Sequence, residues 1–361
     1  MRLRALGVAL AVCGVSVTGA AHGGSVLTGG RDDNGQCEVP TPNSGFVAVA
    51  AGGDHSLGLR ADGSIVAWGL NDDGECNVPA PNAGFKAVAA GAAHSLGLKA
   101  DGSIVAWGDN SWVQCSIPVT NAGFVAVGAG EFHSLGVRAD GSVIAWGRYA
   151  EGQCDVPAPN SGFVAVAGGL WHSVGLKADG SIVAWGNNVW GQCNVPTPNT
   201  GFVAVAAGEF HSLGLKADGS VVAWGRNVEG QCSAPVPNTG FAAIGAGALH
   251  SLGLKAGGAA VAWGNNDYGQ CNVPAGNSGF VAVAGGYDRT LRLTGARGDV
   301  NCDGFVNNGD IDAFVLLVTG SPSYATLYPG CSIMHADING DGLVNNGDID
   351  AFIKLLTAGG G

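Results

Sequence analysis

Residues 46–69 read FVAVAAGGDHSLGLRADGSIVAWG, and close copies of this stretch follow at 85–108, 124–147, 163–186, 202–225 and 241–264. His55 and Trp68 each begin a series that keeps this spacing without deviation. The interval 25–297 holds seven periods with no insertion. A period of about 40 residues with a Trp-Gly pair in each unit is typical of the blades of a β-propeller. The sequence therefore predicts an all-β, seven-bladed β-propeller over residues 25–297.

Each unit is predicted to contain four strands separated by turn residues. Asp62-Gly63 is a strong signal for a two-residue hairpin turn. Ala and Gly crowd the first run, which suits the narrow end of a tapering blade. We therefore expect the first strand at the axis and the fourth at the rim. In the first complete unit, the predicted strands are 46–52, 55–61, 64–69 and 75–79.

The two ends of the repeat array complement each other. Residues 25–30 (SVLTGG) match the third strand of a unit, and residues 35–40 (GQCEVP) match the fourth. The last unit stops after its second strand, at Leu293. The N-terminal strands are therefore predicted to complete the seventh blade, which closes the ring and removes open sheet edges.

Composition narrows the class of protein. The chain has 64 Gly, 46% hydrophobic residues and a formal net charge of −12. So much glycine without a collagen period favours a turn-rich β protein. An acidic chain without a basic stretch is poorly suited to bind nucleic acid or anionic membranes. After position 21, no segment reaches the ~18 continuous apolar residues that a membrane span requires.

Residues 1–21 resemble a signal peptide. Arg2 and Arg4 precede the apolar stretch 5–17, and residues 18–21 offer small side chains for cleavage. Lipid attachment at Cys13 is the alternative, although Val12 is bulky for the position before a lipidated cysteine. We expect a secreted monomer, and the sequence leaves open whether it is released or attached to the cell surface.

The periodic cysteines and histidines are expected to be structural. Seven cysteines, one in each unit, are an odd number and suggest small apolar filler rather than a disulfide framework. Each histidine begins a second strand and is expected to hydrogen-bond the backbone of its own blade rather than a metal. No Ser-His-Asp order and no carboxylate pair stands out against the repeat. The sequence therefore predicts no catalytic residue and no enzyme activity.

Two of the four turns in each unit vary, while the other two scarcely change. The variable turns follow the first and the third strands, so both are predicted on the same face. All the non-periodic aromatic residues of the propeller fall in these two turns. Because exposed aromatic side chains are typical of binding hot spots, the predicted partner-binding residues are Trp112, Phe132, Tyr149, Trp171, Trp190, Phe210, Tyr268 and Tyr287.

Charged residues in the same turns are expected to add polar specificity at the rim of this surface. A protein is the expected partner. A glycan is the alternative partner, because Trp and Tyr also stack on sugar rings. The third hypothesis is a purely structural surface module. The charged residues are Glu131, Glu151, Glu209, Glu229, Arg148 and Arg226.

The repeat AVAAGxxHSLGLKADGSIVAWGxNxxGQCxVP resembles the regulator of chromosome condensation repeat family over residues 25–297. Within that family, the pattern is most similar to that of secreted propeller-type β-lactamase inhibitors. The resemblance implies a propeller that binds proteins. Two features depart from the pattern: Cys stands where Leu is usual after Gly-Gln, and Arg289 replaces the histidine of the seventh unit.

A different repeat occupies residues 298–361. Two twelve-residue loops, 299–310 and 337–348, place oxygen ligands at alternate positions and turn at a glycine. Ca²⁺ prefers six to eight such hard oxygens, so we predict two calcium ions. The predicted ligands are Asp299, Asn301, Asp303, Phe305 and Asp310, then Asp337, Asn339, Asp341, Leu343 and Asp348.

A helix is predicted after each loop. The apolar stripes expected to pack against each other are Ile311, Phe314, Val315 and Val318, and Ile349, Phe352, Ile353 and Leu356.

The loop-then-helix order resembles type I dockerins over residues 298–356, which implies a cohesin-like partner and an association with polysaccharide-degrading assemblies. Asn308-Gly309 and Asn346-Gly347 replace the usual hydroxyl pair. Cys302 and Cys331 are the only cysteines of this module, and a disulfide between them is predicted for an oxidising compartment.

Overall fold

The computed structural model describes two parts of the chain, a large β region and a smaller helical region. The predicted signal peptide, Cys302, Cys331 and eight of the ten predicted calcium ligands lie outside the described residues. None of the described helices is long and apolar enough to cross a membrane. The described residues are 23–117, 120–273, 276–295, 310–319, 323, 327, 333–336, 338 and 344–358.

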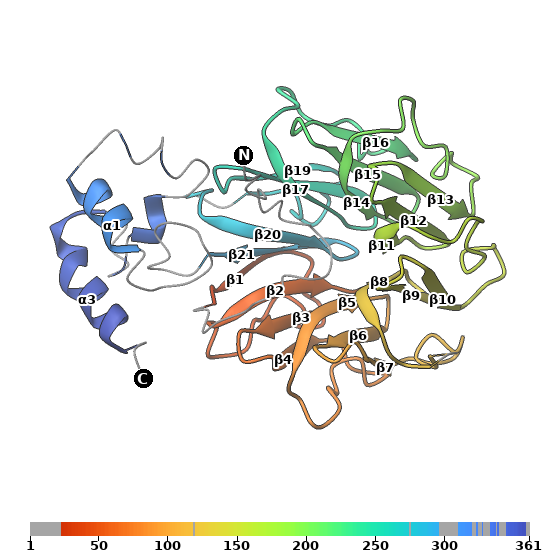
Figure 1. Ribbon diagram of the computed structural model, residues 1–361, viewed down its shortest axis with the longest axis horizontal. Helices are drawn as coiled ribbons and strands as arrows, with labels where there is room; N and C mark the ends of the chain where they lie inside the picture. Colours follow the sequence, from red (N-terminus) through yellow and green to blue (C-terminus); the bar gives the residue numbers. More distant parts are fainter. Residues whose placement is uncertain are drawn as a thin grey trace.

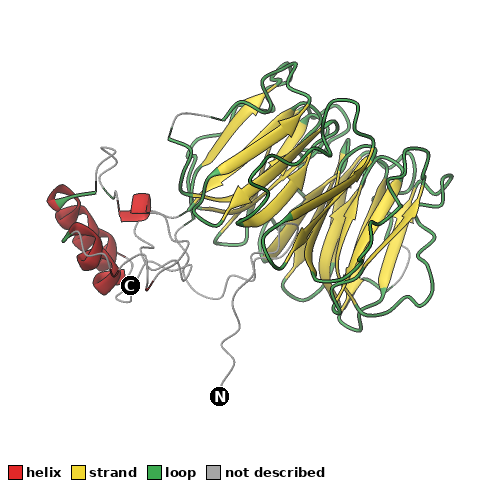
Figure 2. Ribbon diagram, turned by 90° about the horizontal axis from the view of Figure 1, so that it is seen from above, coloured by secondary structure: helices red, strands yellow, loops and turns green. Residues whose placement is uncertain are grey.

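Seven antiparallel sheets of three strands surround a common centre (Figure 1), and Figure 2 shows the same sheets after a turn of 90°. The first strand of each blade lines the central cavity, so the predicted order from axis to rim is confirmed for three strands. From the axis outwards, the blades are blade 1, β2 (Phe46–Ala51), β3 (His55–Arg60), β4 (Ile65–Gly69); blade 2, β5 (Phe85–Ala90), β6 (His94–Lys99), β7 (Ile104–Gly108); blade 3, β8 (Phe124–Ala129), β9 (His133–Arg138), β10 (Val143–Gly147); blade 4, β11 (Phe163–Gly168), β12 (His172–Lys177), β13 (Ile182–Gly186); blade 5, β14 (Phe202–Ala207), β15 (His211–Lys216), β16 (Val221–Gly225); blade 6, β17 (Phe241–Ala246), β18 (His250–Lys255), β19 (Ala260–Gly264); and blade 7, β20 (Phe280–Gly285), β21 (Arg289–Thr294), β1 (Val26–Gly30).

The predicted closure of the ring is confirmed. β1 pairs with β21 from Val26 opposite Leu293 to Gly30 opposite Arg289. The N-terminal strand thus supplies the third strand of blade 7, and neighbouring blades continue around the ring without an open edge between the first and last units.

The predicted fourth strand is wrong, because residues 75–79 form no ladder with the third strand. The chain instead makes a tight turn in which the Cys76 N–H donates to Asn71 Oδ1 at 2.9 Å. It then passes Pro79 and Pro81, which have no N–H to donate to a neighbouring strand. The blade therefore ends at its third strand.

The hydrophobic core lies between neighbouring blades. Trp146 of blade 3 packs in one cluster with Leu96, Leu98 and Ile104 of blade 2. Within each blade, a glycine in the second strand makes room for the periodic phenylalanine. A Cβ on Gly58 would lie 2.4 Å from the Phe46 ring, so only glycine fits there.

The helical region contains α1 (Asp310–Val318), η1 (Ile333–Ala336), η2 (Asn346–Asp348) and α3 (Ile349–Ala358). The rings of Phe314 and Phe352 stack at 4.2 Å between α1 and α3, which confirms that the two helices pack together.

The predicted apolar stripes are rotated from the buried faces. Ile311, Val315, Ile349 and Ile353 are exposed, at 41%, 48%, 38% and 53%. Phe314 and Phe352 of the predicted stripes are buried, and so are Ala313 and the two carboxylates that end the loops, Asp310 and Asp348.

Candidate functional site

The two kinds of variable turn lie on one face of the propeller, as predicted. In blade 1 the Leu70 N–H donates to the Asp54 carbonyl at 2.9 Å, which joins the loop after the first strand to the turn after the third. We call the surface made by residues 52–54 and 70–75, and by their equivalents in the other six blades, the loop face.

The buried histidines link neighbouring blades rather than their own, so the predicted capping within one blade is wrong. His55 Nε2 lies 2.9 Å from Ser95 Oγ of the next blade, and Ser95 Oγ donates to the Glu75 carbonyl at 2.9 Å. Because the serine proton goes to that carbonyl, His55 must donate through Nε2–H. The same relay repeats around the ring as far as His250, which meets Thr290.

These histidines are neutral and structural. Burial lowers the pKa of His133 to about 3 and that of His94 to about 4. A Cβ on the glycine before each loop, such as Gly52, would lie 2.3 Å from the His55 ring, so the loop requires glycine. Because the same buried, neutral histidine recurs in six blades, we assign it to the contacts between blades and not to catalysis.

The periodic tryptophans use the same carbonyls. Trp107 Nε1 donates to the Glu75 carbonyl at 2.8 Å, so that oxygen accepts from both Ser95 and Trp107 of blade 2. Each turn after a third strand is thereby bound to the next blade.

In blade 7, two arginines take the places that histidine and tryptophan side chains fill in the other blades. Arg289 takes the histidine position and donates to the carbonyls of Gly53, at 2.5 Å, and of His55 in blade 1. Burial lowers the pKa of Arg289 to about 10. Gly29 stands where other blades have Trp, and Arg292 stands where they have Gly, with its Nη1 3.5 Å from a Cβ built on Gly29. The guanidinium thus occupies the region that the missing indole leaves.

All seven cysteines of the propeller are unpaired and partly buried, as predicted. Cys76 Sγ lies 3.2 Å from the Leu70 carbonyl, and burial raises its pKa to about 12. These thiols therefore stay protonated and weakly reactive at neutral pH.

The eight predicted partner-binding aromatics divide into two groups. Phe132, Trp171, Phe210 and Tyr287 are only partly accessible. Four others are well exposed on the loop face, namely Trp112 at 48%, Tyr149 at 73%, Trp190 at 48% and Tyr268 at 53%.

Arginine side chains pack over several of these aromatic rings. The residue types alone did not predict these contacts. The Arg148 guanidinium lies 5.5 Å from the Trp112 ring and 5.1 Å from the Trp171 ring. Trp171 in turn meets Phe210 edge to face at 5.8 Å. One continuous aromatic cluster therefore extends from blade 2 to blade 5.

The arrangement recurs at the junction between blades 4 and 5 and at that between blades 6 and 7. Arg226 lies over Trp190 at 5.6 Å, and Arg31 lies over Tyr268 at 5.7 Å. Each of the three stacked aromatics, Trp112, Trp190 and Tyr268, is separated from the next by two repeat units. This double period is the signal in the sequence that could have predicted the stacks.

Each of these arginines also has an acidic neighbour in its own turn. The side-chain pairs are Arg31–Asp33 at 2.6 Å, Arg148–Glu151 at 3.6 Å and Arg226–Glu229 at 2.5 Å. The glutamates that were predicted to supply rim specificity, Glu151 and Glu229, therefore serve to hold the arginines in place.

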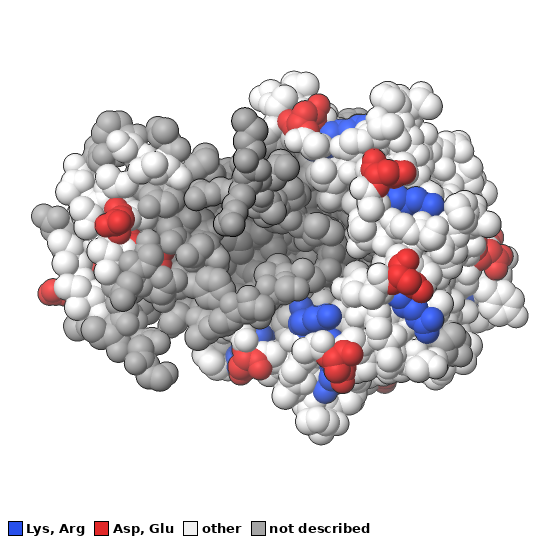
Figure 3. Space-filling model, viewed as in Figure 1, with Lys and Arg blue, Asp and Glu red and all other residues white. Residues whose placement is uncertain are grey.

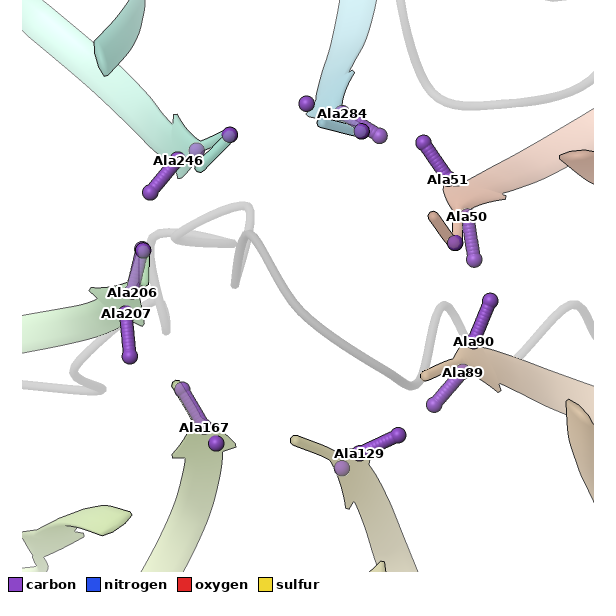
Figure 4. A pocket seen from close by; sticks show the side chains of 18 of the residues that line it. Ala50, Ala51, Ala89, Ala90, Ala129, Ala167, Ala206, Ala207, Ala246 and Ala284 are labelled. Carbon is purple, nitrogen blue, oxygen red and sulfur yellow. The ribbon is translucent and has the colours of Figure 1, made fainter. Parts of the chain in front are cut away.

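A central cavity of about 540 Å³ lies inside the ring of first strands. Figure 4 shows alanines of successive blades, among them Ala50, Ala129 and Ala207, around this space. Apart from Glu131, Glu209 and Tyr287, the described lining is entirely apolar side chains and glycine.

Those three polar side chains come from the loops after β8, β14 and β20, so they lie at the mouth of the cavity on the loop face and not at the rim. A closed circle of backbone hydrogen bonds holds these loops. The bonds run from the N–H of one loop to the carbonyl of the next, Gly53 to Ala92, Ala92 to Glu131, Glu131 to Gly169, Leu170 to Glu209, Glu209 to Ala248, Ala248 to Gly286 and Tyr287 to Gly53, at 3.1–3.4 Å.

The mouth is electrostatically unusual. Burial, together with the charge of Glu209, raises the pKa of Glu131 to about 7, although a hydrogen bond with Tyr287 opposes the shift. Burial also raises the pKa of Glu209. Burial and the neighbouring Glu131 raise the pKa of the Tyr287 hydroxyl. Ionising both glutamates at once is therefore costly in the free protein.

The loop face is strongly acidic, whereas the opposite face is nearly balanced. On the opposite face of blades 1 to 5, a Lys or Arg ends the second strand and an Asp follows in the next turn, and Figure 3 shows neighbouring basic and acidic groups of this kind. Among the described residues, the loop face carries three basic ones, Arg31, Arg148 and Arg226, against thirteen acidic ones, Asp32, Asp33, Asp54, Asp72, Asp73, Glu75, Asp109, Glu131, Glu151, Glu209, Glu229, Asp267 and Asp288.

Glu75 replaces the buried Gln of the other blades and gives a testable prediction. Burial raises its pKa, so its ionisation costs folding free energy as the pH rises. Because the folded-state pKa exceeds the unfolded one, the stability is fully present below the unfolded pKa and is lost as the pH rises through the folded pKa. We expect Glu75→Gln to raise the free energy of unfolding at pH 7 by about 1 kcal/mol or less.

Denaturant titrations at pH 7 and pH 4 measure this effect. The gain should shrink at pH 4, where Glu75 is largely protonated in both folded and unfolded chains. Asp72→Asn, a neighbouring exposed position, serves as the matched control for charge alone. An equal gain at both pH values would contradict the argument.

No cluster of three or more His, Cys, Asp or Glu residues suited to a metal occurs among the described residues. Two of the predicted calcium ligands are described, Asp310 and Asp348, and both are completely buried. Asp348 Oδ1 accepts from the Ile338 N–H at 2.8 Å, and its Oδ2 accepts from the Asn345 N–H at 3.0 Å. The carboxylate thus accepts from backbone N–H groups at positions 338 and 345.

Solved structures share the propeller. Saccharomyces cerevisiae Prp20p is 18% identical with a TM-score of 0.66, and the match covers 78% of this chain and 93% of that chain. Human WBSCR16 is 18% identical with a TM-score of 0.60, and the match covers 75% of this chain and 99% of that chain. The ectodomain of the Physcomitrella patens receptor kinase CR4 is 23% identical with a TM-score of 0.56, over 67% and 68%. These likenesses establish the fold.

No curated protein sequence matches the chain. Six segments match the sequence profile of the regulator of chromosome condensation (RCC1) repeat, residues 46–75, 85–111, 124–153, 163–192, 202–231 and 241–270. Each segment coincides with one of blades 1–6, from its first strand into the turn after its third. The propeller of this chain therefore belongs to the regulator of chromosome condensation (RCC1) repeat family.

Proposed function

We propose that the propeller is a protein-binding module that uses its loop face. The observation that carries the proposal is the exposure of Trp112, Tyr149, Trp190 and Tyr268 on that one face. Arginine stacks hold three of these rings, so they lose little side-chain entropy when a partner covers them. Fixed aromatic anchors are typical of protein interfaces.

The comparisons support this use of the fold. The structural study of Prp20p names its binding to Gsp1p and to histones, and another structure holds yeast Prp20 bound by Kap60. The resemblance to secreted propeller-type β-lactamase inhibitors points to the same class of partner. An export signal at residues 1–21 would place this binding outside the cytoplasm.

The test is capture of exported proteins on the immobilised full chain, with a glycan array in parallel. Tyr149→Ser combined with Trp190→Ala should abolish capture of a protein partner while the melting temperature stays unchanged. The matched control, Lys99→Ser with Lys177→Ala, alters the opposite face and should capture normally. Glycan binding that depends on the same two aromatics would replace the protein proposal with a lectin role.

We propose further that residues 298–361 form a calcium-stabilised docking module. The two described acidic ligands fit this role, because Asp310 and Asp348 are buried at the ends of their loops, where a bound Ca²⁺ would receive their oxygens. Ile311 and Val315 in α1, and Ile349 and Ile353 in α3, leave apolar surface exposed at equivalent positions of the two copies. That surface would meet a cohesin-like partner.

Calcium removal tests the module. Adding a chelator to the full chain is expected to lower the melting temperature of the helical region and to leave the propeller transition unchanged, because bound metal stabilises only the folded loops. Calorimetry of the two transitions measures this. Asp348→Asn should mimic the chelator, while Asp350→Asn, an exposed neighbour, should not. A helical transition that ignores chelator would reject calcium binding.

A further inference from the structure

The arginines of the loop face are already engaged within their own turns and stacks. Arg148 and Arg226 each pair with a glutamate three positions later and lie over tryptophan rings. Among the described residues, neither Glu131 nor Glu209 forms an ion pair. The mouth of the cavity thus holds two partly buried carboxyl groups that stand outside the salt bridges of the loop face.

The surroundings of this mouth have a definite shape. Glu131, Glu209 and Tyr287 come from alternate blades 3, 5 and 7, and all three line the same cavity. Phe132, Trp171 and Phe210 follow lining residues in the chain but do not themselves line the cavity, so Tyr287 is the one aromatic residue of the described lining. Below the mouth the described wall offers only apolar side chains and glycine, so a polar group that enters finds its partners at the mouth and not deeper.

This combination selects one kind of ligand group. Two carboxyl groups and a phenol are too few for a Ca²⁺ ion, which prefers six to eight oxygens. A lysine or arginine side chain suits the site better, because its aliphatic stem packs on apolar surface while its charged end meets carboxylates. The excess of acidic residues over the whole loop face favours a cationic partner in the same sense.

We propose that the mouth of the central cavity receives a lysine or arginine side chain presented by the protein partner, with its cationic end between Glu131 and Glu209 and its stem beside Tyr287 and the apolar wall. This inference rests on the proposed function, since it names the chemistry of the partner that the loop face binds. It makes the axis of the propeller, rather than the exposed aromatics further out, the point of charge recognition.

The experiment uses small analogues of the two side chains. The full chain, uniformly labelled with ¹⁵N, is titrated with n-butylammonium and with n-butylguanidinium, and the backbone amide signals of Glu131 and Glu209 are followed by NMR. A saturable shift is expected with both cations and none with n-butanol or butyrate. A response to butanol as strong as to the cations, or no response to either cation, would overturn the proposal.

Matched variants locate the binding. Glu131→Gln with Glu209→Gln should weaken the apparent affinity for n-butylammonium by about tenfold or more. Asp72→Asn with Asp73→Asn, which removes the same charge from exposed positions elsewhere on the loop face, should leave it unchanged. Retained binding in the first pair, or equal loss in the second, would contradict the assignment. Competition by CaCl₂ beyond the effect of ionic strength would show a metal site instead.

Acidity supplies a second readout. The pKa of Glu131 is about 7, raised by burial and by Glu209. The other charged or titratable groups that act on the mouth are Tyr287, Arg226, Asp54, Asp288 and Glu229. A cation binds the ionised form, so n-butylammonium should bind more tightly at pH 8 than at pH 5.5. An affinity that does not change between these pH values would contradict the proposed site.

The outcomes also separate this inference from the proposed function. If the cations do not bind at the mouth while the Tyr149→Ser, Trp190→Ala variant still fails to capture its protein partner, only the proposed cation site is rejected. If the mouth binds the cations while that variant captures the partner normally, the exposed aromatics lose their proposed role and the mouth keeps its own.

Discussion

Removal of residues 23–36 is expected to destroy the cooperative unfolding of the propeller. The deletion takes away β1, whose five residue pairs with β21 complete blade 7. It also removes the Gln36 carbonyl, which accepts from Ser56 Oγ at 3.1 Å and from Trp68 Nε1 at 3.0 Å. Blade 7 would then have two strands and an open edge beside blade 1. We expect a loss of about 5 kcal/mol or more, which approaches the whole stability of a typical domain.

Denaturant unfolding followed by tryptophan fluorescence and light scattering would show this as a broad transition and as aggregation through the exposed β21 edge. A permuted chain provides the control. In the order 41–295, an Asp-Gly link, 25–40 and 298–361, the strand returns through the same kind of turn that joins second and third strands in the other blades. The permuted chain should recover a sharp transition. A deleted chain that unfolds as cooperatively as the intact one would show that ring closure is dispensable.

The second large effect is expected for Trp146→Ala in blade 3, at about 3–5 kcal/mol. Trp146 is 5% exposed and packs with Leu96, Leu98 and Ile104 of the preceding blade. Its Nε1 donates to the Gln114 carbonyl at 2.8 Å. The substitution therefore opens a cavity between two blades and removes one of the bonds that join them.

Trp146→Phe separates the two contributions, because it keeps much of the buried ring and loses only the donor. We expect it to cost about 1–2 kcal/mol. Urea titrations of both variants, with Trp112→Ala on the exposed loop face as the control, would measure the difference. Equal losses for Ala and Phe would mean that the hydrogen bond, and not the packing, dominates the junction.

The architecture could be predicted because each repeat unit has the same residues at the same positions. The constant spacing of His55 and Trp68 with their later equivalents set the number of blades, and SVLTGG at residues 25–30 indicated the closure. The fourth strand could not be judged in this way. Residues 75–79 have apolar character, but Pro79 and the side-chain bonds of Asn71 decide against a ladder, and those depend on three-dimensional geometry.

The contacts between neighbouring blades could not be predicted from the repeat pattern either. In blades 1 to 6 the second strand of the blade begins with a histidine, but the sequence does not indicate which blade the histidine ring contacts. In the structure, the His55 ring hydrogen-bonds to Ser95 of the next blade. The apolar stripes likewise did not indicate that Asp310 and Asp348 are completely buried while Ile311 is exposed.

For the candidate site, the sequence located the face but not the roles of its residues. Glu131 and Glu229 look equivalent as acidic residues in variable turns. The structure separates them, because Glu229 pairs with Arg226 while Glu131 lines the central cavity. The double period does not make this distinction, since Glu131 and Glu209 are two repeat units apart and so are Glu151 and Glu229.

The circle of backbone hydrogen bonds around the mouth has a consequence for engineering. Because the loops are joined through N–H and carbonyl groups, their anchoring does not depend on which side chains they carry. A library that randomises positions 92, 131, 170, 209 and 248 would change the chemistry at the axis while the frame that presents it stays the same. The propeller thus offers a display scaffold with several adjacent sites that can be diversified independently.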